Sequence, residues 1–404
     1  MRILYVVPFV PWPLRVRSVN LIPRLARRHG IDLVCLASSA NEVSKLDGIG
    51  CLCATVKCEA HSRMRALSQV LWALPSPVPL RMAFASSAAM VEAVQNAIAA
   101  NPPDVIYAER WRALQYVPRD CGIPVVCDPT DSMILYNRRL LSRGSWWERI
   151  VGAEEYVKFL RYEPLLARGA DVNIFCSTLD RDCLLRQDPS LNCEIVPNGV
   201  NCELFFPKNQ SEAEAATVIF TGNFGYRPNF HAAVYFIQEV LPTIRHECPE
   251  LRFLAVGNDA TRRLQKYSAP GIELVDFVPD LRPYIAKATV AVAPLTLGAG
   301  VSNKVLEAFA VGTPVVATAL ACGDLPIRHG EHLYLANSSK PFAERVLELL
   351  ENPSLRARMV EKGRALVEAE YDWEAVTQKL ENIMYRLVET RTPVVKDMAT
   401  SRLA

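Results

Sequence analysis

The stretch VAVAPLTLGAGVSNKVLEAFAVGTPVVAT, residues 290–318, decides how the second half of this chain folds. It opens with an apolar β-branched run that predicts a strand, followed by a loop containing two glycines. Ser302 or Asn303 can cap a short helix, and Gly312 can end that helix in the left-handed conformation before a second strand. The stretch thus predicts a strand–helix–strand unit, and the free N–H groups at the start of its helix favour a bound anion.

Two charged residues on this predicted helix carry the chemical argument. Lys304 stands in the first turn, where a positive charge opposes the helix dipole, so binding an anion is one reason to keep it there. Glu307 follows three residues later on the same side of the helix. Its carboxylate can accept hydrogen bonds from a vicinal diol such as a ribose. The alternative is a surface ion pair between the two, contributing under about 1 kcal/mol.

A second glycine-containing turn follows another predicted strand, in the segment VIFTGNFGYRPN at residues 218–229. After Gly222 it brings two amide side chains, Asn223 and Asn229, and a guanidinium, Arg227, that can reach a phosphate. The alternative is an ordinary strand-to-helix turn capped by asparagines. The turn at 218–229 supports a phosphate site only in combination with the strand–helix–strand unit at 290–318.

Short apolar runs alternate with helix-length amphipathic segments along nearly the whole chain, which predicts parallel sheets in an α/β fold. The periodicity breaks at Pro197-Asn198-Gly199 and in the polar stretch 208–215. We therefore expect two doubly wound, Rossmann-like domains facing each other across a cleft, with ligands beyond the carboxyl ends of the strands. The expected boundaries are 1–200 and 201–372, with a helix at 373–394 packing back on the first domain and a flexible tail at 395–404. The expected strands are Ile3–Val7, Ile31–Leu36, Val105–Ala108, Val125–Asp128, Val172–Cys176, Cys193–Val196, Thr217–Thr221, Arg252–Val256, Ile272–Val275, Val290–Ala293 and Val315–Thr318.

Composition narrows the class of protein. A length of 404 residues suits two or three domains, and the balance of 45 basic against 43 acidic residues provides no field for generic nucleic-acid binding. Each apolar run is interrupted before the 18 residues that a spanning helix needs, and the start of the chain lacks the pattern of a signal peptide. Twelve cysteines, most of them in apolar runs, are too few for a disulfide scaffold. A cytoplasmic protein is expected, with a peripheral position at the inner membrane face as the alternative.

With these motifs in hand, the chain resembles the GT-B glycosyltransferases, specifically the retaining family 4 (group 1), and is most similar to bacterial exopolysaccharide- and exosortase-associated sugar transferases. The matching pieces are PNGVN at 197–201 with Phe205 and Pro207, FTGN at 220–223, RPN at 227–229, FVPD at 277–280, NKVLEA at 303–308 and GTPVV at 312–316. The resemblance implies a nucleotide-diphosphate sugar, UDP- or GDP-linked, as a substrate of the second domain, with no cofactor and no metal.

The resemblance also assigns roles in the donor site. Glu307 would bind the ribose, residues near Phe277 and Val278 would line the base, and Lys304 and Glu307 count as catalytic. The loop and helix start, namely Gly298, Gly300, Val301, Ser302, Asn303 and Lys304, would hold the pyrophosphate. The family's first glutamate would fall at Ala299, and its usual arginine and lysine at Asn223 and Asn229. We interpret this as a variant site in which Lys304 and Arg227 supply the positive charge.

The acceptor side is expected in the first domain, where the acceptor is a glycan, a lipid-linked molecule or a small molecule. Asp128 and Asp131 close one strand, and Asp131 is a candidate catalytic carboxylate that orients the acceptor, with helix capping as its alternative. Further candidates at the ends of other strands are Arg15, Arg17 and Glu109, with Arg110 beside the last.

Other readings stay open at this point. Basic and aromatic residues at 138–162 and an apolar, basic stretch at 63–82 favour contact with a membrane surface, or else ordinary helix faces. Cys51, Cys53, Cys58 and His61 match no usual zinc spacing. A sugar-nucleotide epimerase or a non-catalytic nucleotide-sugar-binding partner are the rival functions.

Overall fold

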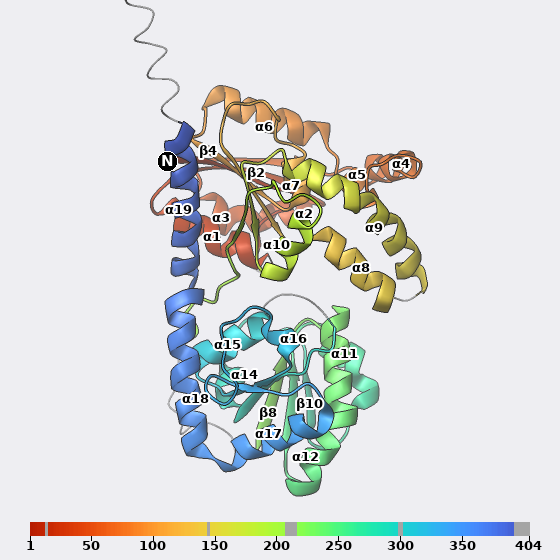
Figure 1. Ribbon diagram of the computed structural model, residues 1–404, viewed down its shortest axis with the longest axis vertical. Helices are drawn as coiled ribbons and strands as arrows, with labels where there is room; N and C mark the ends of the chain where they lie inside the picture. Colours follow the sequence, from red (N-terminus) through yellow and green to blue (C-terminus); the bar gives the residue numbers. More distant parts are fainter. Residues whose placement is uncertain (13–14, 144–145, 207–215, 298–301, 392–404) are drawn as a thin grey trace, which may run out of the picture. The chain divides into compact units, whose positions relative to one another are not determined.

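The computed structural model describes residues 1–12, 15–143, 146–206, 216–297 and 302–391. It divides the chain into two compact units, one formed by Met1–Val196 together with the chain from Thr377 onward, the other by Pro197–Val376. Each unit is an α/β layer structure around a parallel sheet, as Figure 1 shows.

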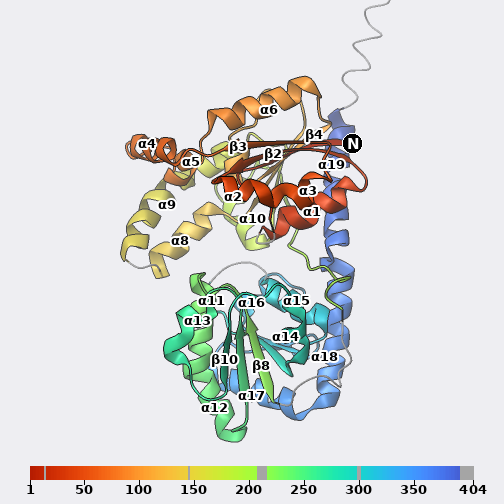
Figure 2. The same ribbon diagram turned by 180° about the vertical axis from the view of Figure 1, so that it is seen from behind.

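Unit 1 is built on a seven-stranded sheet in the order β3-β2-β1-β4-β5-β6-β7, and all its neighbouring strands are parallel. Helices α1 and α6 lie on opposite faces of this sheet (Figures 1 and 2). The strands are β1 (Arg2–Val7), β2 (Gly30–Ala37), β3 (Thr55–Ala60), β4 (Val105–Glu109), β5 (Val125–Thr130), β6 (Val172–Phe175) and β7 (Cys193–Ile195). The helices are α1 (Val16–Ala26), α2 (Ala40–Val43), α3 (Asp47–Gly50), α4 (Arg63–Ala73), α5 (Leu80–Phe84), α6 (Ala88–Ala100), α7 (Trp111–Leu114), α8 (Met133–Arg143), α9 (Trp146–Ala167) and α10 (Thr178–Leu185).

Unit 2 has a six-stranded sheet in the order β10-β9-β8-β11-β12-β13, again parallel throughout. Its strands are β8 (Thr217–Thr221), β9 (Arg252–Val256), β10 (Ile272–Val275), β11 (Val290–Ala293), β12 (Val315–Ala317) and β13 (Tyr334–Leu335). Its helices are α11 (Arg227–Tyr235), α12 (Leu241–Glu247), α13 (Ala260–Leu264), α14 (Arg282–Lys287), α15 (Asn303–Val311), α16 (Ala319–Cys322), α17 (Ser339–Glu351) and α18 (Pro353–Leu366). The last helix among the described residues, α19 (Trp373–Arg391), begins in this unit and continues into unit 1.

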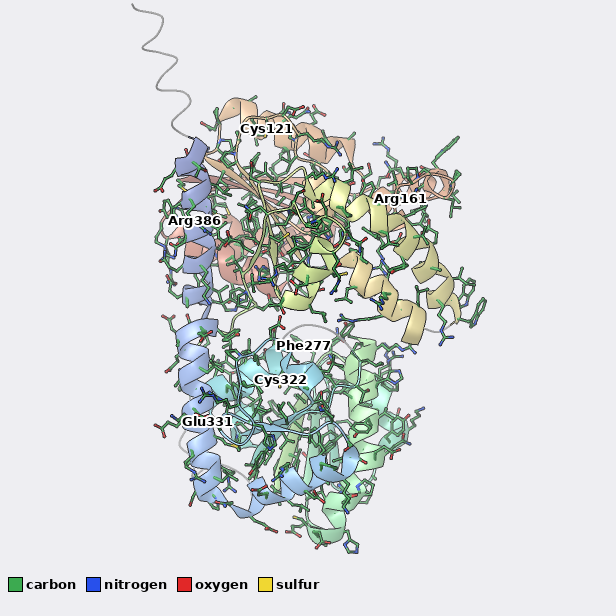
Figure 3. All side chains as sticks on the ribbon, in the orientation of Figure 1. Cys121, Arg161, Phe277, Cys322, Glu331 and Arg386 are labelled. Atoms are coloured by element: carbon green, nitrogen blue, oxygen red, sulfur yellow. The ribbon has the colours of Figure 1, made fainter. Side chains whose placement is uncertain are left out.

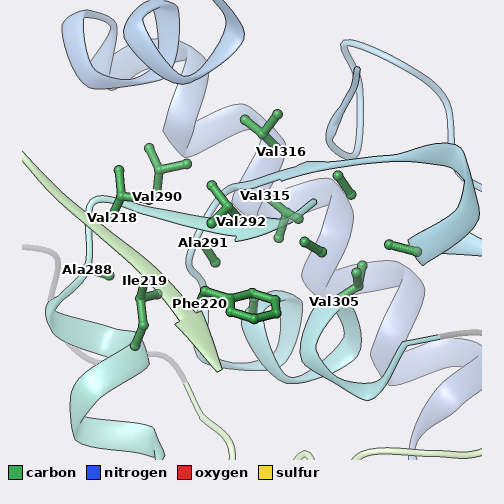
Figure 4. Close-up of a cluster of buried hydrophobic side chains, with 14 of the residues drawn as sticks. Val218, Ile219, Phe220, Ala288, Val290, Ala291, Val292, Val305, Val315 and Val316 are labelled. Atoms are coloured by element: carbon green, nitrogen blue, oxygen red, sulfur yellow. The ribbon is translucent and has the colours of Figure 1, made fainter. Parts of the chain in front are cut away.

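The expected alternation of strands and helices is confirmed, and so is the α/β, doubly wound architecture. The core of unit 2 explains why the strands fall where the apolar runs are. Val218 and Phe220 of β8, Val290 and Val292 of β11 and Val305 of α15 are all buried and belong to one hydrophobic cluster (Figure 4). Because strands of a parallel sheet are covered on both faces, they appear in the sequence as continuous apolar runs rather than alternating ones.

The start of helix α1 matters for the site. The helix begins at Val16, so Arg17, which was expected at the end of a strand, lies inside the helix with its side chain buried. Leu21, Ile22 and Leu25 hold the helix against the sheet.

Candidate functional site

The candidate site of unit 2 lies where the strand order of its sheet reverses. β8 and β11 are neighbours, and from them the chain winds outward in opposite directions to β10 and β13. At such a switch point the loops after the two central strands diverge and leave room for a ligand at the carboxyl edge. The two turns singled out in the sequence follow these two strands, so the fold brings them together.

Helix α15 begins at Asn303 with Ser302 in the N-cap position, and Gly312 ends it with φ 83°. Ser302 has extended backbone and donates its N–H to Ala321 O at 3.0 Å. The expectation that Ser302 caps the helix is confirmed in position, but among the described residues its side chain makes no hydrogen bond to the first turn. The hydroxyl of Ser302 instead accepts a hydrogen bond from Lys304 Nζ at 3.0 Å. The N-terminal N–H groups of α15 thus receive no side-chain acceptor.

Lys304 links the two turns. Besides Ser302, its ammonium donates to Asn229 Oδ1 at 3.1 Å, and it lies 5.2 Å from the centre of the Phe220 ring. An ammonium has three N–H donors, so one remains for a ligand. Burial lowers the pKa of Lys304 from 10.5 to about 8, although the charge of Glu307 acts in the opposite direction. A charge that is difficult to solvate is one that a bound anion stabilises strongly.

Glu307 shares this partly buried environment. Burial raises the pKa of its carboxyl group, and the neighbouring Lys304 offsets part of that rise. The hydrogen bonds of Lys304 Nζ go to Asn229 and Ser302. The alternative of an exposed Lys304–Glu307 surface pair therefore does not describe these residues.

The turn after β8 is fixed by close packing. Asn229 Nδ2 donates to Asn223 O at 3.0 Å, while Asn223 Oδ1 accepts from Gly225 N at 2.9 Å. A Cβ on Gly222 would lie 2.8 Å from Asn229 Nδ2, so this position needs glycine for Asn229 to reach Lys304. Arg227, in the first turn of α11, donates to His231 Nε2 at 3.2 Å. Asn223 and Asn229 therefore shape the turn and orient the lysine.

The remaining predicted donor residues divide into two groups. Phe277, labelled in Figure 3, is 63% exposed just after β10, while Val278 packs against the core of unit 2. An exposed aromatic ring near the carboxyl edge suits stacking on a base. Gly298, Gly300 and Val301, with Ala299, lie outside the described residues.

In unit 1 the structure corrects two of the acceptor-side predictions. Arg17 and Asp128 are both fully buried and form an ion pair with each other. Asp128 also accepts a hydrogen bond from Tyr107, and Arg17 donates to Val196 O at 3.0 Å. A buried carboxylate and guanidinium that satisfy each other support the fold, so neither faces a ligand.

Glu109 is a third correction. Its side chain is buried and accepts a hydrogen bond from Tyr5 at 2.8 Å. Burial raises the pKa of its carboxyl to about 7. Although Glu109 is the last residue of β4, its side chain is enclosed in the protein and does not face a ligand.

The structure brings the other two acceptor-side predictions together. Arg15 and Asp131 line one pocket of about 570 Å³ at the carboxyl edge of the sheet, between the ends of β4 and β5. Asp131 pairs with Arg110 at 3.3 Å. It is not the helix cap that was its alternative, since Ser132 Oγ accepts from Leu135 N at the start of α8. Sequence reasoning missed Arg81 and Arg112 in this pocket; the arginine at 112, two residues after Arg110, was the one available signal.

Two other ideas can be checked against the described residues. No group of three or more His, Cys, Asp or Glu there is placed to hold a metal ion. His61, for example, uses Nε2 to contact the backbone oxygen of Phe84 at 2.8 Å. Among the helices described, none combines the length and apolar character required for crossing a bilayer.

Known glycosyltransferases are similar to this chain in sequence. The family model "Glycosyl transferases group 1" matches residues 215–352. The phosphatidyl-myo-inositol mannosyltransferase of Mycobacterium leprae is 29% identical over 205 residues, which are 48% of this chain and 54% of that protein. The chain thus spans about half the length of the curated relatives it matches.

Solved structures resemble the chain over nearly its whole length. Sucrose-phosphate synthase from Thermosynechococcus elongatus superposes with a TM-score of 0.71 at 19% identity, covering 96% of this chain and 99% of the other. Anabaena HepE in complex with UDP-glucose gives a TM-score of 0.67 at 14% identity, covering 96% and 100%. At these identities the likeness establishes a common GT-B fold.

Proposed function

We propose, on the premise that this chain belongs to the group 1 (family 4) glycosyltransferases, that it transfers a sugar from a nucleotide-diphosphate donor to a hydroxyl acceptor with retention of configuration. The donor is a UDP- or GDP-sugar bound by unit 2. The observation that carries the proposal is the position of Lys304. Its ammonium joins the two turns at the sheet's switch point and has an N–H left for a ligand.

The positive end of the site suits a diphosphate. The N–H groups that begin α15 have no side-chain acceptor, and the helix dipole adds to the charge of Lys304. The carboxylate of Glu307, one helical turn after Lys304, accepts hydrogen bonds from the two ribose hydroxyls. The ring of Phe277 stacks on the base. Lys304 and the helix start can provide the charge stabilisation that a divalent cation gives in other sites, so the proposal includes no metal.

The chemistry follows from stabilising a departing anion. The bond between the anomeric carbon and the β-phosphate oxygen breaks, and the developing charge on the diphosphate is stabilised by Lys304 and the α15 amides. The acceptor oxygen forms the new bond on the face that the diphosphate leaves. Its proton passes to a phosphate oxygen, so the scheme requires no protein base. Asp131 in unit 1 accepts a hydrogen bond from the acceptor and orients it.

Two measurements test the proposal. Calorimetry against a panel of nucleoside diphosphates should show binding of one base, and Glu307→Gln should weaken it about tenfold or more, since charge-assisted hydrogen bonds contribute about 1.5 to 3 kcal/mol. The matched control is Glu361→Gln, an exposed glutamate on α18. Binding of no nucleotide by the wild-type chain, or equal binding by both variants, contradicts the site.

Turnover separates the rival functions. Incubation with the matching nucleotide sugar should release the diphosphate, by transfer when an acceptor is present and by slow hydrolysis when it is not. An epimerase would convert the sugar with no release of diphosphate. A binding partner without activity would leave the donor intact.

A further inference from the structure

Four arginines line the pocket of unit 1, and ion pairs among the described residues neutralise only two of them. Arg81 lies 3.6 Å from Glu155, and Arg110 lies 3.3 Å from Asp131. Within the described part of the chain, Arg15 and Arg112 form no ion pair. Like charges held together in a pocket repel one another, and a bound anion would relieve this repulsion between the guanidinium groups.

The protonation behaviour of the unpaired arginines agrees with this geometry. Burial lowers the pKa of Arg112, and the neighbouring charges of Arg110, Arg15 and Arg81 lower it further. Burial and the charge of Arg110 also lower the pKa of Arg15. A phosphate among them would replace repulsion by bidentate, charge-assisted hydrogen bonds.

The pocket has the position of a ligand site in this fold. The strand order of unit 1 reverses between β1 and β4, and Arg15 follows β1 while Arg110 and Arg112 follow β4. Arg110 adopts φ 77°, a left-handed conformation that is unfavourable for a non-glycine residue. Such conformations concentrate at functional sites.

The rest of the pocket wall is apolar. Apart from the arginines and Asp131, the lining is hydrophobic and aromatic, with Val70, Leu80, Met82, Trp111 and Phe159 among its side chains. A free phosphate or a sugar phosphate would leave this surface unused. The combination fits a molecule with an anionic head and an apolar body.

An apolar stripe continues from that wall along α4. Val70 lines the pocket, and Leu67 and Leu74, three and four residues away, lie on the same side of the helix. Leu67, Leu71 and Leu74 are exposed. Lys158 of α9 donates to Ala73 O at 2.8 Å and so fastens this end of α4. Exposed leucines in such a row are favourable only against another apolar surface.

We propose that the arginine pocket of unit 1 binds the phosphate of a phospholipid-like acceptor whose hydrocarbon chain lies along the α4 stripe. The identification of the bound lipid as the acceptor rests on the proposed function. The binding of a phosphate-bearing amphiphile to this pocket does not depend on it.

The test is direct binding to the full chain of three probes, namely dioctanoyl phosphatidic acid, dioctanoylglycerol and inorganic phosphate. The phosphatidic acid should bind at least tenfold more tightly than either of the others. Arg112→Met should weaken that binding at least tenfold, and Leu67→Ser with Leu71→Ser should remove the preference over inorganic phosphate. The control Arg119→Met removes an exposed arginine from the loop before β5, at the other edge of the sheet.

Three outcomes overturn the inference. Equal binding of inorganic phosphate and the lipid means a simple anion site, equal binding of dioctanoylglycerol means apolar adsorption, and wild-type affinity in Arg112→Met removes the arginines from recognition. If thermal melting shows that Arg112→Met does not fold, Arg15→Met gives the same comparison. Nucleotide binding, measured on the same samples, should stay unchanged in every variant. Its absence in the wild type contradicts the proposed function without touching the lipid result.

Discussion

Replacing Lys304 by methionine removes the charge at the centre of the proposed donor site while nearly keeping the length of the side chain. Two of the three N–H donors of Lys304 are used by Asn229 and Ser302. The third would bond the diphosphate, and a charge-assisted hydrogen bond contributes about 1.5 to 3 kcal/mol. A loss of about 2 kcal/mol of binding free energy corresponds to a dissociation constant roughly 30-fold larger. Calorimetric titration with the preferred nucleoside diphosphate measures this dissociation constant.

The same change should not weaken the fold. Burial lowers the pKa of Lys304 to about 8, which means that the folded chain holds this charge at a cost. Methionine removes that cost, so the free energy of unfolding should stay level or rise. Lys362→Met, on the exposed side of α18, is the control for loss of one positive charge. Unchanged affinity in Lys304→Met, or an equal loss in Lys362→Met, refutes the reasoning.

Three further predictions follow from described contacts. Donor affinity should be level from pH 6.5 to 7.5 and fall above pH 8 by no more than the roughly 30-fold lost in Lys304→Met, because only protonated Lys304 attracts the diphosphate. The unfolded chain, whose lysine has a pKa of 10.5, holds that proton to higher pH, so the Lys304 contribution to the free energy of unfolding rises between pH 8 and 10.5. Lys304→Met should show neither pH dependence. Asp128→Asn should cost about 3 kcal/mol or more of unfolding free energy in urea, because it leaves the buried Arg17 charge unpaired; a stable variant with altered acceptor affinity would restore Asp128 to the ligand site. Gly363→Ala should cost about 1 to 3 kcal/mol in the same assay, since its Cβ would lie 2.7 Å from Phe309 Cδ1, while donor affinity per folded molecule stays normal.

The fold was predictable because its strands are buried on both faces. Largely apolar runs of four or five residues predicted β8, β9, β10 and β11 with their observed bounds. Thr55–Ala60 escaped prediction because β3 is an edge strand, largely exposed and polar in sequence. β13 has only two residues, too few for any periodicity.

The site was predictable to the extent that it depends on position along strands. Both donor-side turns follow central strands, and parallel topology alone brings Lys304 to the edge that holds Asn229. The buried ion pair between residues on different elements of unit 1 could not be predicted from the sequence. Arg17 and Asp128 are 111 positions apart, and nothing local distinguishes a carboxylate that closes a buried pair from one that faces a ligand.

Unit 1 is assembled from two distant parts of the chain, because α19 beyond Thr377 belongs to it. Glu381 is buried there between His29 and Arg28, each 2.8 Å away, and Leu380 and Met384 are buried as well. During synthesis the first 196 residues therefore cannot complete their fold until the whole of unit 2 has left the ribosome. Until then the apolar surface that α19 covers stays exposed to water. A fragment that stops before α19 should aggregate, and the missing helix supplied as a separate peptide should rescue it.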